Sequence, residues 1–289
     1  MKLSVVLATR NEAENIKACL ASVKNIAYEI IVVDENSTDE TREIAKELGA
    51  RVYKVVHEPI FHITKQKAVD YAAGDWILQL DADEKVTPKL ALEIREVIKL
   101  NNKELKGRIF EDKKKLSLFK RHQQMIEQRD GPIGRKSGEI AAFFIPRVNY
   151  FLGKPLKHAG LYPDGVIRLF KKGKAFFPAK SVHEQMEVNG EGGWLFNELE
   201  HHDSPTFKKY LTRMNRYTEL TSEEFKSKDL NLNSLTLFNY STIKPLSIFL
   251  NLYIRHLGFL DGTRGFLWSL LSSLHYPLAY YKYWQKNKL

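Results

Sequence analysis

The sequence contains a single cysteine, Cys19, among its 289 residues. One cysteine excludes an internal disulfide and a cysteine-rich zinc site. Long apolar runs are also scarce near the start, where residues 3–8 form a stretch too short for an export signal or a membrane span. We therefore expect the start of the chain to remain in the cytoplasm. No internal repeat and no recognisable nucleic-acid-binding motif is present, and we expect no nucleic-acid partner.

The composition is that of a globular protein. Hydrophobic residues make up 43% of the chain and charged residues 28%, which is enough apolar material for a full core. The formal net charge of +10 favours anionic partners such as anionic lipids or phosphorylated substrates, although the same excess could serve solubility alone. The length allows one large domain or two small ones.

The first hundred residues alternate between strand and helix patterns. This order predicts an α/β fold with a mostly parallel sheet flanked by helices. Ligands of such sheets bind beyond the carboxyl ends of the strands, and acidic clusters at residues 34–35 and 81–84 follow two of them. The expected strands are residues 3–8, 29–33, 51–56 and 76–80.

The rest of the chain has a different character. Residues 101–204 are rich in Gly and Pro and contain short strand patterns, which suggests a lower half of the same domain with loops for a second substrate. The last part is helical. For Phe266 to Tyr281 two interpretations remain open, an interfacial helix with a basic end or a helix packed on the core.

Asp81-Ala82-Asp83 directly follows a buried strand. Two carboxylates at this spacing can share one hard cation, Mg²⁺ or Mn²⁺, which prefers oxygen ligands and keeps positions free for phosphate. An isolated triplet of this kind is common in surface turns, so its place at a strand end carries the interpretation. Asp34 and Glu35 end another strand, where they could accept hydrogen bonds from a ribose or a base, or Asp34 could cap a helix.

Three stretches, residues 4–12, 31–39 and 73–84, together resemble family 2 glycosyltransferases of the GT-A fold. The resemblance implies that Asp34 and Glu35 contact uridine, that Asp83 binds the metal, and that Asp81 lies near the ribose or diphosphate. Arg10 stands where many members carry an aromatic residue, and its planar guanidinium could stack on a base. The resemblance also implies a nucleotide pocket lined by Ala8, Thr9, Arg10 and Glu12.

Later motifs resemble the bacterial branch of lipopolysaccharide core β-glucosyltransferases. This likeness implies an inverting transfer of a hexose, glucose from UDP-glucose, to a lipopolysaccharide or other lipid-linked acceptor at the inner face of the membrane. The implied organisation is a nucleotide-sugar half over residues 1–100, an acceptor and catalytic half over 101–225, and a membrane-associating helical segment over 226–289. The motifs are residues 162–164, 168–170, 182–184, 201–202, 215–218 and 258–262.

An inverting transferase needs a base to deprotonate the acceptor hydroxyl. The contiguous Glu-Asp pair that many relatives use is absent, so Glu184 is our first candidate and Asp164 our second. A salt bridge is the alternative role for Glu184, and a turn after Pro163 is the alternative for Asp164.

Further polar residues could meet the donor diphosphate or the metal. His183, His201 and His202 are candidates, and we take His202 as a metal ligand by resemblance, although a lone histidine is often structural. Arg168 could balance the diphosphate charge or pair with Asp164. Lys67, with Lys65 on the same expected helix, could reach the phosphates or face solvent.

Rival functions share parts of this pattern. A transferase of the same fold could act on a peptide or a soluble acceptor, or the chain could bind nucleotide sugars without catalysis. A nucleotidyltransferase would require a Gly-rich phosphate loop after the first strand, and Ala8-Thr9-Arg10-Asn11-Glu12 is not one.

Overall fold

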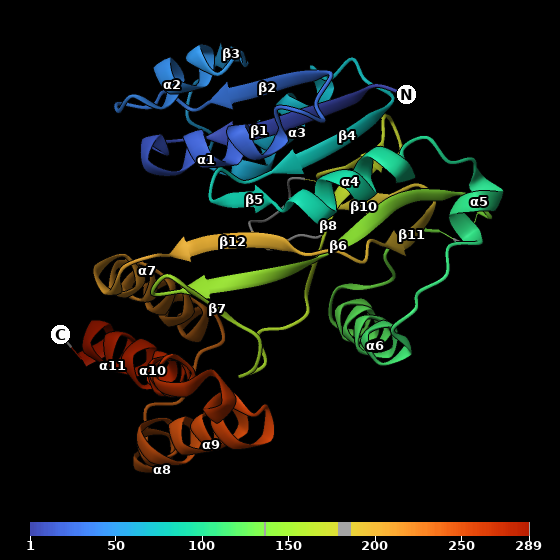
Figure 1. Cartoon of the computed structure of the whole chain (residues 1–289). Helices are drawn as coiled ribbons and strands as arrows, with labels where there is room; N and C mark the ends of the chain where they lie inside the picture. The colour runs from blue at the N-terminus through green and yellow to red at the C-terminus, as the bar shows by residue number, and fades with distance from the viewer. Residues whose placement is uncertain (136, 179–185, 289) are drawn as a thin grey trace. The chain divides into compact units, whose positions relative to one another are not determined.

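The computed structural model describes residues 1–135, 137–178 and 186–288. The chain divides into two compact units. Unit 1 comprises Met1–Arg147 and Pro163–His201, and unit 2 comprises Val148–Tyr162 and His202–Leu289. Figure 1 shows the elements of both units, coloured by residue number.

Four parallel strands form the first part of the sheet in unit 1. Their spatial order is β3-β2-β1-β4, and β1 and β4 are buried along their whole length. Parallel strands need a crossover connection, usually a helix, and helices supply it here. The strands are β1 (Leu3–Thr9), β2 (Glu29–Asp34), β3 (Arg51–Lys54) and β4 (Trp76–Leu80), and the helices of this part are α1 (Ala13–Val23), α2 (Thr41–Glu47), α3 (Phe61–Asp70) and α4 (Pro88–Val97).

The second part of the sheet is mainly antiparallel. Strand β8 (Asp164–Lys171) pairs antiparallel with β4, and β6 (Ile140–Phe151) pairs antiparallel with β8. The direction changes because these strands are not joined by the regular βαβ crossovers of the first part. The remaining elements of this part are β5 (Glu84–Val86), α5 (Asn102–Lys106), α6 (Lys113–Asp130), β9 (Ala175–Phe176), β10 (Glu187–Val188), β11 (Glu191–Trp194) and β12 (Leu199–Ser204).

The main core of unit 1 joins the sheet to helices α1 and α4. Side chains at helical spacing on α1, Ile16, Cys19, Leu20 and Val23, are buried against it. Helix α4 begins at Pro88 behind the capping hydroxyl of Thr87, as the sequence predicts. This packing fixes the positions of the carboxyl ends of β1, β2 and β4, which are the points where the chain leaves these strands.

Unit 2 is helical apart from the ends of β6 and β12 and the short strand β7 (Lys154–Leu156), which pairs with β6. Helix α11 (His275–Lys288) packs along α7 (Phe207–Ser227), with Tyr280, Tyr283 and Phe225 buried in one cluster. Its other elements are α8 (Ser234–Phe238), the π-helical turns η1 (Asn239–Ile243) and η2 (Asn251–Arg255), α9 (Lys244–Leu250), the 3₁₀ turn η3 (Gly258–Asp261) and α10 (Gly262–Ser273).

Helix α10 approaches its neighbours closely through small residues. Gly265, Ser269 and Ser273 are buried, and a Cβ at Gly265 would lie 1.8 Å from the carbonyl oxygen of Gly258. One side of residues 266–281 is therefore packed within unit 2. Among the described residues, no helix combines the length and the apolar character that crossing a membrane requires.

The α/β architecture predicted from the sequence is confirmed, together with its helical C-terminal extension. The sheet is parallel in its first four strands, as expected, and mixed beyond them. The basic segment 103–128 contains most of α5 and of α6.

Candidate active site

Asp34 lies at the carboxyl end of β2, directly beside Thr9 at the end of β1. Its buried carboxylate accepts hydrogen bonds from the hydroxyl of Thr9 at 3.1 Å and from the backbone N–H and hydroxyl of Ser37 at 2.9 and 2.5 Å. These bonds fix the turn that leaves β2. Ala8, the preceding residue of β1, is buried, so this pair of strand ends is a rigid platform.

Glu35 is also buried, and it connects to two residues that flank the platform. It accepts a hydrogen bond from the Thr64 hydroxyl, and its Oε2 lies 2.6 Å from Nδ1 of His57. The other ring nitrogen of His57 lies 2.8 Å from the guanidinium of Arg10. This chain of contacts holds the exposed Arg10 in place. His57 could not be predicted from the sequence, because no pattern around it indicates a contact with a residue 22 positions away.

Glu12 closes the turn after β1. Its backbone N–H donates to the hydroxyl of Thr41 at 2.8 Å, and its carboxylate accepts a hydrogen bond from Asn15 at 2.7 Å. Asn11 has a φ of +55°, a left-handed conformation that asparagine adopts more readily than most residues. The turn therefore ties Glu12 to the start of α2 through Thr41 and leaves Arg10 exposed.

Asp81, at the end of β4, lies between two cations. Its Oδ1 is 2.6 Å from Nζ of Lys65, and its Oδ2 is 2.5 Å from Nη2 of Arg168. Burial alone would raise the pKa of Asp81, but the charges of Arg168 and Lys65 outweigh burial and hold that pKa well below its usual range. Asp81 is therefore ionised at neutral pH, and both of its oxygens already have partners.

A row of alternating charges continues from Asp81 through the sheet. Arg168 also lies 2.8 Å from Glu84. Arg147 lies 3.0 Å from Glu84 and 2.7 Å from Asp164, so it links these two carboxylates. Glu84 is fully buried. Burial lowers the pKa of Arg168, yet its acidic neighbours raise it overall. Arg168 was considered as a partner of the diphosphate or of Asp164, and the ion pairs that it forms in the structure are with Asp81 and Glu84.

Arg147 is a second residue of this cluster that no sequence pattern indicated. It follows Pro146 on β6, and its register opposite Asp164 on β8 brings the two side chains together. Its charge is needed because Glu84 is buried without direct access to solvent. No motif marks Arg147, and only the strand pairing reveals it.

Asp83 lies beside a histidine. Oδ2 of Asp83 is 3.5 Å from Nε2 of His201, and neither side chain is fully buried. Burial raises the pKa of Asp83, but the hydrogen bond and charge of His201 outweigh it, so the pKa is lowered. His202 belongs to unit 2, where its ring stacks on Tyr150 with centroids 4.1 Å apart.

A carboxylate and an imidazole are suitable ligands for a divalent cation, so Asp83 and His201 fit the metal that the sequence implies. No group of three metal-ligating side chains occurs in the described ranges 1–135, 137–178 and 186–288. Any cation held here would therefore take further ligands from the donor or from water.

One predicted residue, Lys67, lies away from the acidic cluster. Lys67 pairs with Glu58 at 2.6 Å, so the lysine of α3 that reaches the acidic cluster is the buried Lys65. Glu184 and His183 lie outside the described residues.

Cys19 donates weakly to the backbone oxygen of Asp81 at 3.6 Å, and burial raises the pKa of its thiol well above the usual value.

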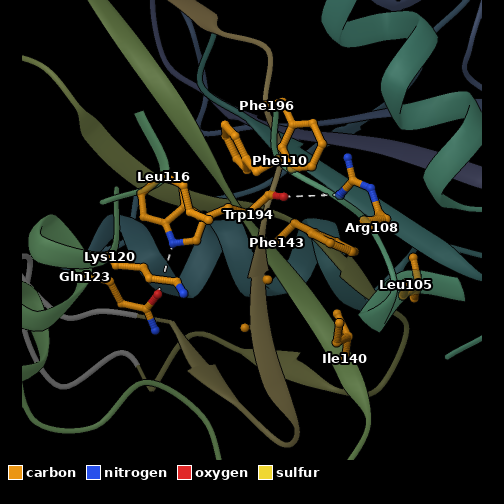
Figure 2. A pocket seen from close by; sticks show the side chains of 12 residues that line it. Leu105, Arg108, Phe110, Leu116, Lys120, Gln123, Ile140, Phe143, Trp194 and Phe196 are labelled. Atoms are coloured by element: carbon orange, nitrogen blue, oxygen red, sulfur yellow. Dashed lines mark hydrogen bonds between the residues drawn. The ribbon is translucent and has the colours of Figure 1, made fainter. Parts of the chain in front are cut away.

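A separate hollow of about 300 Å³ lies in unit 1 among α5, α6, β6 and β11. Figure 2 shows that aromatic rings surround it, with Gln123 hydrogen-bonded to the indole N–H of Trp194. None of the predicted site residues lines it. Its aromatic lining residues are Phe110, Phe143, Trp194 and Phe196.

Comparison with known proteins gives a consistent family. The family described as "Glycosyl transferase family 2" matches residues 4–159, more than half of the chain. An uncharacterised glycosyltransferase of Rickettsia felis is 42% identical over 105 residues, which cover 36% of this chain and 36% of that protein. A dolichol-phosphate mannosyltransferase of Pyrococcus furiosus is 34% identical over 111 residues, covering 34% of this chain and 30% of its own length. The matches thus span about a third of each relative.

Among solved structures, glucosyl-3-phosphoglycerate synthase of Mycobacterium tuberculosis, crystallised with Mn²⁺, UDP and phosphoglyceric acid, shows 27% sequence identity. The likeness covers 32% of this chain and 36% of that one, and its TM-score of 0.29 is too low for a structural inference. The family match covers β1, β2 and β4 with all their acidic ends, as well as β6. The chain has the GT-A architecture and belongs to glycosyl transferase family 2.

Proposed function

We propose that the chain transfers glucose from UDP-glucose, with inversion, to a lipopolysaccharide or other lipid-linked glycan at the inner face of the membrane. The observation that carries the proposal is the position of Asp34 at the end of β2 and of Asp81 and Asp83 after β4, at the carboxyl ends of the two strands that flank β1, in a family 2 glycosyltransferase. Ligands of parallel sheets bind at this edge.

The nucleotide would lie over the ends of β1 and β2. We propose that Asp34 and Glu35 contact the uridine, and that Ala8, Thr9 and Glu12 form the floor and wall of its pocket. Arg10, held by His57, would place its planar guanidinium against the base. The bonds that already fix Asp34 and Glu35 keep this pocket rigid before the donor arrives.

The diphosphate would lie near the row of charges. We propose that Asp83 holds the divalent metal and that His201 assists it, because His201 is the histidine beside Asp83. A bound Mg²⁺ or Mn²⁺ would neutralise charge on the departing diphosphate. Asp81 holds Lys65 and Arg168, and we propose that these cations, with Lys67 farther along α3, face the donor phosphates.

The acceptor hydroxyl needs a base. Arg147 contacts one oxygen of Asp164 through two nitrogens, at 2.9 and 2.7 Å, and an ion-paired carboxylate is a weaker proton acceptor. We therefore keep Glu184 as the proposed base and Asp164 as the second candidate.

Thermal unfolding with a panel of nucleotide sugars tests the donor. A ligand that binds only the folded protein, present at about 100 times its Kd, adds about 2.7 kcal/mol of stability. UDP-glucose with Mn²⁺ should raise the unfolding temperature, and UDP-glucose with a chelator should raise it less. Equal shifts for all nucleotide sugars, or none for UDP-glucose, would refute the proposed donor.

A further inference from the structure

Unit 2 exposes an unusual number of apolar side chains. Between Leu235 and Leu260, ten large hydrophobic residues are at least 43% exposed, and Leu235 is 80% exposed. Large apolar side chains exposed at this density indicate a binding face rather than ordinary solvent-exposed surface. The ten are Leu235, Leu237, Phe238, Ile243, Leu246, Leu250, Ile254, Leu257, Phe259 and Leu260.

The helical stretch from Lys244 to Arg255 is apolar on both sides. Its inner side packs through aromatic rings, since Phe249 and Tyr253 both contact Phe266 of α10, with centroids 5.8 and 5.7 Å apart. Exposed aliphatic residues recur at intervals of three or four on the stretch and just beyond its two ends, namely Ile243, Leu246, Leu250, Ile254 and Leu257, here called the aliphatic face. A helix that is apolar all round belongs in a core or at a membrane, and only its inner side has a core to contact.

The stretch that carries this face has charges of one sign. Residues 235–260 contain two basic residues, Lys244 and Arg255, and no acidic residue, and the next acidic residue along the chain is Asp261. The carboxylate of Asp261 is already occupied, because it accepts the backbone N–H groups of Lys157 and His158 and lies 2.9 Å from the His158 ring. Arg255, within the stretch that carries the face, is exposed. The basic side chains of this stretch would therefore attract an anionic surface, and no free carboxylate of the stretch would repel it.

We infer that the aliphatic face of unit 2 inserts into the surface of a bilayer with anionic headgroups. The inference deepens the proposed function, on which it rests for the lipid-linked acceptor, and it assigns the contact to α9 and its flanking turns rather than to residues 266–281. A second copy of the chain is a poorer occupant, since a two-fold contact would bring Arg255 and Lys244 of both copies to one interface.

Flotation with vesicles of phosphatidylcholine, with and without phosphatidylglycerol, tests the inference. The full chain should float with the anionic vesicles, less with neutral ones, and less at high salt because screening weakens the attraction. Combining Leu246→Ser, Leu250→Ser and Ile254→Ser should lower partitioning by about tenfold or more, because each substitution removes apolar surface from the interface.

A matched triple variant of unit 1 supplies the control. Leu92, Ile109 and Met125 are 60%, 82% and 56% exposed, and replacing all three with Ser should leave flotation unchanged. Since every substituted residue is at the surface, circular dichroism should be that of the wild type in both variants. Flotation of the Leu246/Leu250/Ile254 variant at the wild-type level, or a wild type that does not float, overturns the inference.

Two further measurements separate the outcomes. Sedimentation would reveal a dimer that the same triple variant abolishes, and that result without vesicle binding also overturns the inference. Donor binding is followed on the same proteins as the thermal shift with UDP-glucose and Mn²⁺. A protein that floats but shows no donor shift supports the bilayer contact and refutes only the proposed donor.

Discussion

Nη2 of Arg168 lies 2.5 Å from Oδ2 of Asp81, with the guanidinium almost fully buried. This contact joins β8, from the antiparallel part of the sheet, to the end of β4 in the parallel part. It means that the acidic cluster is electrically balanced before any donor or metal binds.

Removing that guanidinium should be costly. Arg168→Gln leaves Asp81 with Lys65 alone and leaves the buried Glu84 with Arg147 alone, and breaking a buried ion pair typically costs about 3–5 kcal/mol. We expect a loss near the lower end of that range, because each acid keeps one cation. Urea unfolding measures the loss. Arg10→Gln, at an exposed position, is the control and should cost little, whereas equal stability of the two variants would contradict the finding.

Two neighbouring histidines should differ in their effect on metal use. His201 lies beside Asp83, while His202 stacks on Tyr150. We expect Asp83→Asn to abolish metal-dependent turnover and His201→Gln to raise the Mn²⁺ concentration needed for half-maximal activity by about tenfold. His202→Gln is the matched control, and a larger effect of His202→Gln than of His201→Gln would reverse the assignment.

Glu184→Gln should separate binding from transfer. The amide keeps the size of the side chain but cannot accept the acceptor's proton, so turnover should fall by at least about 100-fold while the thermal shift with UDP-glucose stays the same. Asp164→Asn provides the comparison. Full activity of the Glu184 variant, with loss in the Asp164 variant, would move the role to Asp164.

The stability of unit 1 should depend on pH through His122. Burial lowers the pKa of this histidine, and its unprotonated Nε2 accepts the backbone N–H of Gly165 at 3.0 Å. A folded-state pKa below the unfolded value of about 6.5 gives a contribution that is complete above that pH and is lost as the pH falls below it. Unfolding temperatures between about pH 7.5 and pH 5 should decline more steeply for the wild type than for His122→Gln. Parallel curves would exclude His122 as the cause.

Gly165 should tolerate no side chain. A Cβ there would lie 2.3 Å from the indole of Trp194. Gly165→Ala must therefore displace that ring, and it should also shift Asp164, the residue before Gly165 in the chain. Overpacking of this kind costs about 1–3 kcal/mol. Gly107→Ala is the matched control, since its nearest neighbour would be 3.4 Å away. A Gly165→Ala variant with wild-type stability and tryptophan fluorescence would show that the added methyl group does not displace the ring.

The strands and their acidic ends could be predicted because both signals are local. An apolar run followed by Asp81-Ala82-Asp83 indicates a buried strand and its carboxyl end without knowledge of any partner. Arg147 and His57 could not be found this way. Each acts through a contact with a residue 17 to 63 positions away, and such a contact depends on strand register and loop path. For residues 266–281 the sequence left an interfacial helix and a packed helix open. The more exposed apolar residues lie earlier in the chain, because one side of α10 and of α11 packs within unit 2.

Cys19 gives the chain a practical property. Its side chain lies on the buried face of α1, and burial raises the pKa of the thiol well above the usual value, so the reactive thiolate is scarce. The native protein should therefore be nearly inert toward maleimides. A cysteine introduced at an exposed position, for example Leu250→Cys, would be labelled alone, and an environment-sensitive dye attached there would report directly whether that position leaves water when vesicles are added.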